Sequence, residues 1–439
     1  MANKKQLRWL YRALREWEAE GLITKEQGER LRARYGSAGP ETTPTWGIVI
    51  IAILGVLLIG GGIILMVAYN WEALSRPWRT ALRFAPLVLA EGVYGYVFFR
   101  RRRSPAWVEG ASTFLFLMLG ASLALISQTY HIAGTLDEFL LSWALLSIPL
   151  LYLMNASLPA VLYLIGIAWW VVERGGSTSV WYWGLLAAVL PHLIIHLRAD
   201  RSPLRRNVLG WALTLTFSVA WWWVIEVDLT AFSLVGSALV LSLFYLIGKE
   251  YNSHPPMLLR APFRTVAVAG MFIMLLVLSF RLDLPAHSFG DLTQGIRYRP
   301  WAARINLLVL ILLFGAYIFL FLRGVTRRGP IAYAISLFPF VIIAYLFLYT
   351  PSAPRPAMAL ANLFALGLGL IYLITGIQRQ RLGLVNIGLL FILVLATVRF
   401  FDTDWSYIAK GTAFILLGAG FLAANWVLSR RWKETATTG

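Results

Sequence analysis

The chain has 439 residues, of which 59% are hydrophobic and 14% are charged, with a formal net charge of +18. Its mean hydropathy of +0.69 exceeds what a water-soluble domain can bury, so a soluble globular fold is excluded. There is no cysteine, which excludes disulfides, thiolate metal sites and cysteine nucleophiles. The basic residues lie beside the ends of apolar runs, so they indicate topology anchors, and we expect no nucleic-acid partner.

Residues 1–36 are highly charged and are predicted to form a cytoplasmic helical hairpin rather than a cleavable signal. Gly21 suits the left-handed end of its first helix, and Thr24 with Gln27 has the spacing of a capping box at the start of the second. Residues 37–45 are predicted to be a linker. The hairpin is a candidate surface for a cytoplasmic protein partner.

Fourteen apolar segments follow, and they predict an all-α, polytopic transmembrane bundle over residues 46–428, with membrane lipids as partners. Residues 429–439 are predicted to be a cytoplasmic tail. The fourth and fifth segments are short, so they are either two full crossings or a re-entrant pair. The segments are 46–69, 80–99, 110–130, 139–154, 156–173, 180–197, 208–226, 229–248, 263–281, 301–322, 330–349, 356–376, 382–399 and 406–428.

The placement of charge gives an orientation, because lysine and arginine are retained in short cytoplasmic loops. Arginine-rich connections at 100–103, 198–206, 323–328 and 379–381 alternate with acidic ones, which predicts a multi-pass protein of the cytoplasmic (inner) membrane with both termini cytoplasmic. The outward loop 282–300 departs from this pattern, since it contains Arg297 and Arg299. It is either a lid over the outer face or a plain connection.

Several local patterns resemble the bacterial membrane proteins grouped as domain-of-unknown-function family 2157. The similarity covers about the first 175 residues, with a weaker one near the C-terminus, and it implies location and architecture because the family has no established activity. The patterns are Gly21 to Gln27, Asn70-Trp71, Gln128 to Gly134, Leu141 to Leu145 with Pro149, and Val398 to Asp402.

Ionisable residues inside hydrocarbon are costly, so each is a functional candidate. Glu91 lies near the middle of the second segment, where it either carries a proton or cation or forms a structural ion pair. Gln128, Tyr130 and His131 close the third segment, and the following turn can return Asp137 toward His131. This cluster suits proton transfer or a polar ligand, or it is an interfacial cap.

Basic residues near the outward helix ends form a second candidate group. Arg304 begins the tenth segment, and Arg399 with Asp402 ends the thirteenth. With Arg297 and Arg299 these arginines are candidates for an anion site, whereas an internal Arg399–Asp402 pair is the simpler interpretation. His192 and His196 stand four residues apart, but we interpret them as interfacial and predict no metal and no cofactor.

Three functions fit these features. The first is a permease or flippase-like protein for a polar or lipid-linked anionic substrate. The second is a membrane enzyme that acts on a lipid carrier, with His131 and Asp137 as acid and base. The third is a non-catalytic sensor or scaffold that uses the hairpin.

Overall fold

The computed structural model describes residues 10, 13–14, 16–18, 20–35, 75–130, 133–175, 179–199, 203–228, 233–251, 261–280, 300–329, 331–350, 352–402 and single helical residues between 408 and 422. Over these ranges every regular element is a helix, so the predicted all-α fold is confirmed. The chain divides into two compact units, Met1–Ala81 and Leu82–Gly439.

The smaller unit contains α2, Lys25–Tyr35, and the helical residues that precede it. Gly21 has a φ of +72°, and the N–H of Leu22 donates to the carbonyl of Trp17. The Thr24 N–H donates to Gln27 Oε1 at 2.9 Å, and the Gln27 N–H donates to Thr24 Oγ1 at 3.3 Å. The left-handed turn and the capping box predicted from the sequence are therefore confirmed.

The helices from α4 onward account for twelve of the fourteen predicted segments, the second to the thirteenth. The first predicted segment, 46–69, lies outside the described residues, and only scattered residues of 406–428 are described. The elements are α4 (Arg76–Tyr96), η1 (Val97–Arg101), α5 (Pro105–Tyr130), α6 (Leu136–Leu153), α7 (Leu158–Arg174), α8 (Ser179–Ala199), α9 (Pro203–Asp228), α10 (Ser233–Tyr251), α11 (Pro262–Leu278), α13 (Pro300–Arg328), η4 (Ile331–Leu337), α14 (Phe338–Leu348), α15 (Arg355–Gln378) and α16 (Leu382–Asp402).

Seven of the described helices, α5, α6, α9, α10, α13, α15 and α16, are long and apolar enough to cross a membrane. Shorter apolar stretches occupy α8, α11 and the η4–α14 segment. At 18 and 17 residues, α6 and α7 are each about 26 Å long, which is close to the thickness of the hydrocarbon layer. These lengths suit two crossings better than a re-entrant pair.

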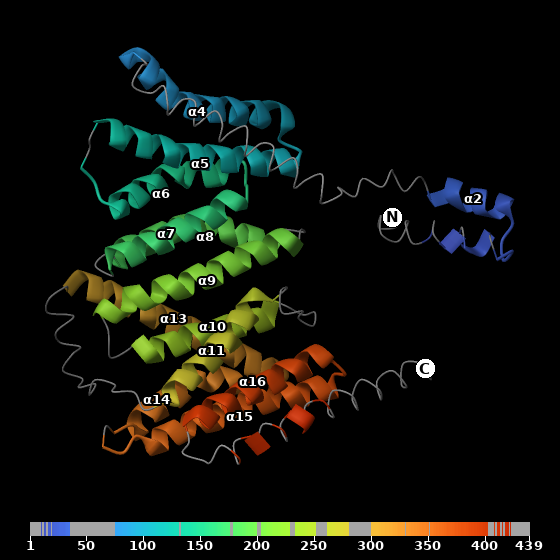
Figure 1. Ribbon diagram of the computed structural model, residues 1–439, viewed down its shortest axis with the longest axis vertical. Helices are drawn as coiled ribbons and strands as arrows, with labels where there is room; N and C mark the ends of the chain where they lie inside the picture. The colour runs from blue at the N-terminus through green and yellow to red at the C-terminus, as the bar shows by residue number, and fades with distance from the viewer. Residues whose placement is uncertain are drawn as a thin grey trace. The chain divides into compact units, whose positions relative to one another are not determined.

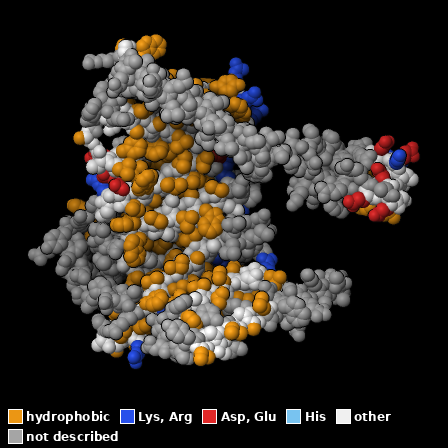
Figure 2. Space-filling model, in the orientation of Figure 1, with side chains coloured by type: hydrophobic (Ala, Val, Ile, Leu, Met, Phe, Trp, Pro, Cys, Tyr) orange, Lys and Arg blue, Asp and Glu red, His pale blue; other side chains and the backbone are white. Residues whose placement is uncertain are grey.

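Successive helices run in alternating directions, so the larger unit has two ends. At one of these ends α5, α7, α9, α11 and α16 begin, and α6, α8, α10, α13 and α15 end. We call it the basic end, because the following residues lie there: Arg205, Lys249, Arg264, Arg327 and Arg379. In Figure 2 hydrophobic side chains cover the visible face of the helices, and the basic side chains lie at its margins. This distribution is the one expected of helices surrounded by lipid.

Two hydrophobic cores hold the helices together. One is built from α5 to α9 around Tyr163 and Trp170, and the other from α9 to α16 around Met271 and Phe338. Figure 1 shows these helices side by side, with α9 next to α10 and α11. Trp183 packs against both cores.

Glycine permits close helix approach at two positions. A Cβ at Gly120 would lie 2.5 Å from the indole of Trp143, whose Nε1–H donates to the Phe116 carbonyl at 2.9 Å and so joins α5 to α6. A Cβ at Gly369 would lie 2.8 Å from Ile392 of α16. Gly367, by contrast, has open space around its Cβ position.

Candidate functional site

Two cations at the basic end rest on tyrosine rings. Lys249, in the last turn of α10, has its Nζ 3.8 Å from the centre of the Tyr333 ring and 5.7 Å from that of Tyr245. The guanidinium of Arg264, in the first turn of α11, lies 5.9 Å from the Tyr245 ring and 6.0 Å from the Tyr372 ring. Tyr245 thus stands between the two cations, and we call these five residues the tyrosine–cation cluster.

Close helix packing positions Arg264. A Cβ at Gly248 would lie 2.8 Å from the backbone nitrogen of Arg264, so only glycine lets α10 approach the first turn of α11 this closely. Arg264 hydrogen-bonds the side chain of Tyr372 on α15, whereas its Nε is buried and makes no hydrogen bond. Three helices therefore fix this guanidinium.

A carboxylate lies beside part of the cluster. Glu250 accepts a hydrogen bond from the Tyr333 hydroxyl at 2.9 Å and lies 3.9 Å from Arg327. Within the described ranges no carboxylate lies within ion-pair distance of Arg264. The described contacts of the Arg264 guanidinium are therefore with the tyrosines.

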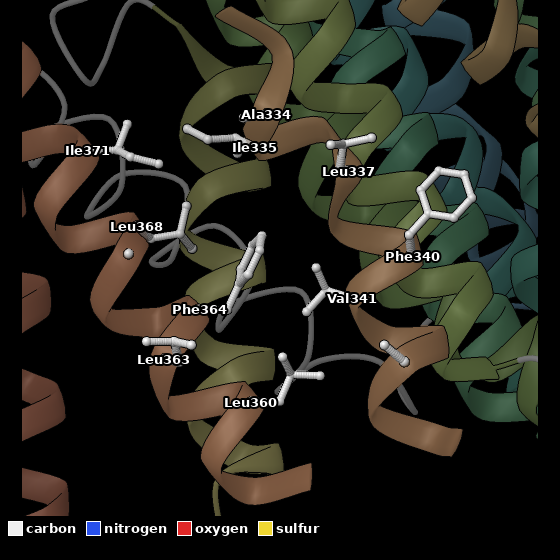
Figure 3. Close-up of a pocket in the computed structure, with 12 residues that line it drawn as sticks. Ala334, Ile335, Leu337, Phe340, Val341, Leu360, Leu363, Phe364, Leu368 and Ile371 are labelled. Carbon is white, nitrogen blue, oxygen red and sulfur yellow. The ribbon is translucent and has the colours of Figure 1, made fainter. Parts of the chain in front are cut away.

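An apolar groove of about 510 Å³ lies between the η4–α14 segment and α15. In Figure 3, Phe364 of α15 and Val341 of α14 lie opposite each other across it. The lining is hydrophobic throughout, from Ala334 and Ile371 at one extreme to Leu360 at the other. Ala334 lies near the start of the η4–α14 segment and Ile371 near the end of α15, so this extreme of the groove is the one nearer the basic end.

In the other half, Glu109 of α5 connects three helices at the basic end. Its carboxylate accepts hydrogen bonds from the N–H and the hydroxyl of Ser157, at 2.9 and 2.6 Å, and from the N–H of Leu158 at 2.9 Å. Arg205 of α9 lies 3.2 Å from the same carboxylate. Glu109 thereby caps the N-terminus of α7 and pairs with α9.

Two histidines of α8 lie at the same end. Their rings are 4.4 Å apart, and the residues are 1% and 6% exposed, so His192 and His196 are buried inside the bundle. Their interfacial placement stays a prediction, and within the bundle the Tyr152 ring of α6 has its centre 6.0 Å from that of His192. Across the described residues no group of three or more His, Cys, Asp or Glu side chains is arranged to hold a metal ion.

The structure describes only part of the first candidate group, which comprises Glu91 and the cluster around His131. Glu91 is exposed on α4. Gln128 and Tyr130 belong to the last turn of α5, with side chains outside the described part, and His131 lies outside the described residues altogether. Asp137 forms an ion pair with Arg174 at 3.0 Å, a partner that the sequence did not indicate.

The predicted outward arginines contact different neighbours. Arg304 is exposed on α13, 5.7 Å from the ring of Trp301. Arg399 of α16 donates to Ser279 Oγ at 2.8 Å and lies 5.0 Å from the ring of Phe280. The side chain of Asp402 and the whole of the loop with Arg297 and Arg299 are outside the described part, so the predicted Arg399–Asp402 pair stays a prediction.

Sequence reasoning missed Glu109 and Arg264, although one signal was available for both. Each is an ionisable residue within the first turn or two of an apolar helix, whereas Glu91 was selected because it lies near the middle of its segment. What the sequence could not supply was the partner: Ser157 is 48 residues from Glu109, and Tyr372 is 108 residues from Arg264.

A comparison with known protein families finds a match for the first third of the chain. The model of the family described as "Predicted membrane protein (DUF2157)" matches residues 15–160. The matched region contains both members of the Gly120–Trp143 contact and both members of the Glu109–Ser157 contact. No curated protein and no solved structure matches the chain.

Proposed function

We propose that this helical membrane protein, whose residues 15–160 resemble that family, is a flippase-like permease for a lipid or lipid-linked anionic substrate. The supporting observation is the groove between α14 and α15, which is apolar and has one extreme toward the basic end of the helices. A hydrocarbon chain fits the groove, and the arginines and lysines of the basic end suit an anionic group.

The properties of the groove favour a lipid over a small polar solute. Its volume of about 510 Å³ is in the range of ligand sites, but such sites normally add several polar groups for orientation. Here the lining from Ala334 to Leu360 offers none, so the polar recognition has to come from the adjoining basic end.

The structure offers less support for an enzyme. Asp137, the proposed base, is held by Arg174 at 3.0 Å, and an acid–base role requires this ion pair to open. The third alternative is a sensor or scaffold that binds a cytoplasmic protein through the N-terminal hairpin. In that case deletion of residues 1–40 would abolish function, whereas changes in the groove would have little effect.

Filling the groove is expected to slow lipid translocation. Gly367 lines the groove and has open space around its Cβ position, so Gly367→Phe places a ring in the groove without displacing backbone. With the full-length protein in vesicles containing a headgroup-labelled anionic lipid, we expect translocation to fall about tenfold, equivalent to about 1.4 kcal/mol on the barrier.

The matched control is Gly315→Phe on α13, another helical glycine with open space, which does not line the groove between α14 and α15. It should translocate lipid at the wild-type rate. Absence of translocation in the wild-type protein would reject the proposed activity.

The proposed orientation, with the basic end in the cytoplasm, has its own test. The chain lacks cysteine, so single cysteines can be introduced without background labelling. In right-side-out membrane vesicles we expect an impermeant maleimide to label Ser352→Cys, in the connection before α15, and to label Gln380→Cys at the basic end only after permeabilisation. The reverse pattern would invert the assignment.

A further inference from the structure

One imidazole inside the bundle has no well-formed hydrogen bond. His192 of α8 is 1% exposed, and neither ring nitrogen makes a hydrogen bond of normal geometry within the described part of the chain, although the backbone of Ala156 lies beside the ring. A neutral imidazole carries one donor and one acceptor, so burying it in this way costs free energy. An ionisable residue at such a place is a candidate for function.

A second histidine lies against the first. The centre of the His196 ring is 4.4 Å from that of His192, one turn further along α8, and the residue is 6% exposed. Histidine is the side chain whose ordinary pKa, about 6.5, lies closest to physiological pH. Because two positive charges this close repel inside a protein, the pair suits one proton rather than two.

Charged and titratable groups around the pair come from three neighbouring helices. Glu109 of α5 and Arg205 of α9 act electrostatically on His192, and Tyr152 of α6 has its ring centre 6.0 Å from that of the imidazole. The Glu109 and Arg205 side chains are about a quarter exposed. Water at the basic end therefore reaches the charges that act on His192.

The other neighbours of α8 contact it through uncharged groups in the described ranges. Tyr163 of α7 donates to the Leu185 carbonyl at 3.0 Å, two turns before His192. On α13, Asn306 accepts from the Trp183 indole at 2.8 Å, near the opposite end of α8.

Burial links proton binding to helix position. A protonated imidazole has two N–H donors and needs two acceptors, which the described surroundings of His192 do not supply with normal geometry. The arrangement in the structure therefore suits the neutral pair, and a protonated pair favours one in which water reaches the ring. Since Tyr152 covers this side of α8, the movement that admits water separates α8 from α6.

We propose that His192 and His196 form a binding site for a single proton, and that proton binding couples the movement of α8 against α6 to lipid translocation. The proton comes from water at the basic end and binds the lone pair of an imidazole nitrogen. The coupling rests on the proposed function, whereas proton binding can be measured without transport.

The site is tested by nitrogen-15 NMR of the full-length protein in detergent, with labelled histidine, between about pH 8 and about pH 4. The chain has five histidines, so single substitutions assign the signals. We expect the signals removed by His192→Gln and His196→Gln to report uptake of one proton by the pair. His254→Gln is the control, and it should leave both signals unchanged.

The coupling is tested by translocation of a headgroup-labelled anionic lipid in vesicles at about pH 5.5 and about pH 7.5. We expect the wild-type protein to be at least about fivefold faster at the lower pH, the lower end of ordinary coupling between two sites. His192→Gln should remove this difference, and His254→Gln should keep it. If His192→Gln does not fold, judged by its thermal melt, His196→Gln takes its place with the same expected result.

Two titration results would overturn the site: both rings remaining neutral throughout, or each ring taking up a proton independently of the other. An unchanged pH dependence of translocation in folded His192→Gln would overturn the coupling. Absence of translocation at either pH would reject the proposed function, while the titration would still decide the proton site.

Discussion

Replacement of Glu109 by glutamine is expected to lower the free energy of unfolding by about 2–3 kcal/mol. The carboxylate accepts two bonds from Ser157 and one from Leu158, and it pairs with Arg205 at 3.2 Å. In a glutamine side chain an amide nitrogen replaces one acceptor oxygen, so a donor faces another donor at the start of α7. Arg205 also loses its ion-pair partner in a site where both side chains are only about a quarter exposed.

Thermal unfolding of the detergent-purified protein measures this effect. Glu173→Gln is the control, because Glu173 is an exposed carboxylate in the last turn of α7, and we expect a change within about 0.5 kcal/mol. If both variants unfolded at the wild-type temperature, Glu109 would not be the connector between α5, α7 and α9 that its contacts indicate.

Replacement of Gly388 by valine is expected to destabilise the contact between α15 and α16 by about 3 kcal/mol. A Cβ at Gly388 would lie 2.5 Å from the backbone nitrogen of Leu373 and 2.6 Å from the carbonyl oxygen of Gly369. Because these are backbone atoms, no rotamer change relieves the clash, and the helices have to separate. The larger side chain also interrupts packing around Tyr372 and Phe391, whose rings are 6.0 Å apart.

Gly383→Val, in the first turn of the same helix, gives the comparison. A Cβ at Gly383 meets nothing within 4 Å, so this substitution should leave the melting temperature within a few degrees of the wild type. Equal destabilisation by the two variants would mean that helix propensity, rather than the close approach at Gly388, sets the cost.

The membrane-spanning segments could be predicted from the sequence because hydrocarbon imposes one rule on every residue of a span. Backbone groups have to be satisfied within the helix and side chains have to be apolar, so a run of about 20 apolar residues is diagnostic on its own. The predicted segment 382–399 accordingly lies within α16. The capping box at Thr24 was predictable for a similar reason, since both partners lie within four residues.

The sequence did not predict how the segment 330–349 begins. It starts as a 3-10 helix, Ile331–Leu337, before α14 begins at Phe338. Pro339 has no N–H to donate to the Ile335 carbonyl in an α-helical ladder, and the neighbouring Ser336 carbonyl accepts a hydrogen bond from the hydroxyl of Tyr317 of α13 at 2.8 Å. That donor comes from tertiary packing, which hydropathy does not encode.

The candidate site was harder to predict than the fold, because its charges are paired across the bundle. Asp137 could be singled out by composition, but its partner Arg174 is a full helical hairpin away. Similarly, the positions of His192 and His196 near the charged end of α8 did not reveal that both side chains are buried against neighbouring helices. Which residues meet depends on helix rotation and order, and an apolar sequence constrains these only weakly.

A density map of the full-length protein in nanodiscs that contain phosphatidylglycerol and phosphatidylcholine tests the central proposal most directly. The account predicts continuous density for a hydrocarbon chain between Val341 and Phe364, with the lipid headgroup toward the basic end. A map in which α14 and α15 close on each other and leave no lipid between them would contradict it.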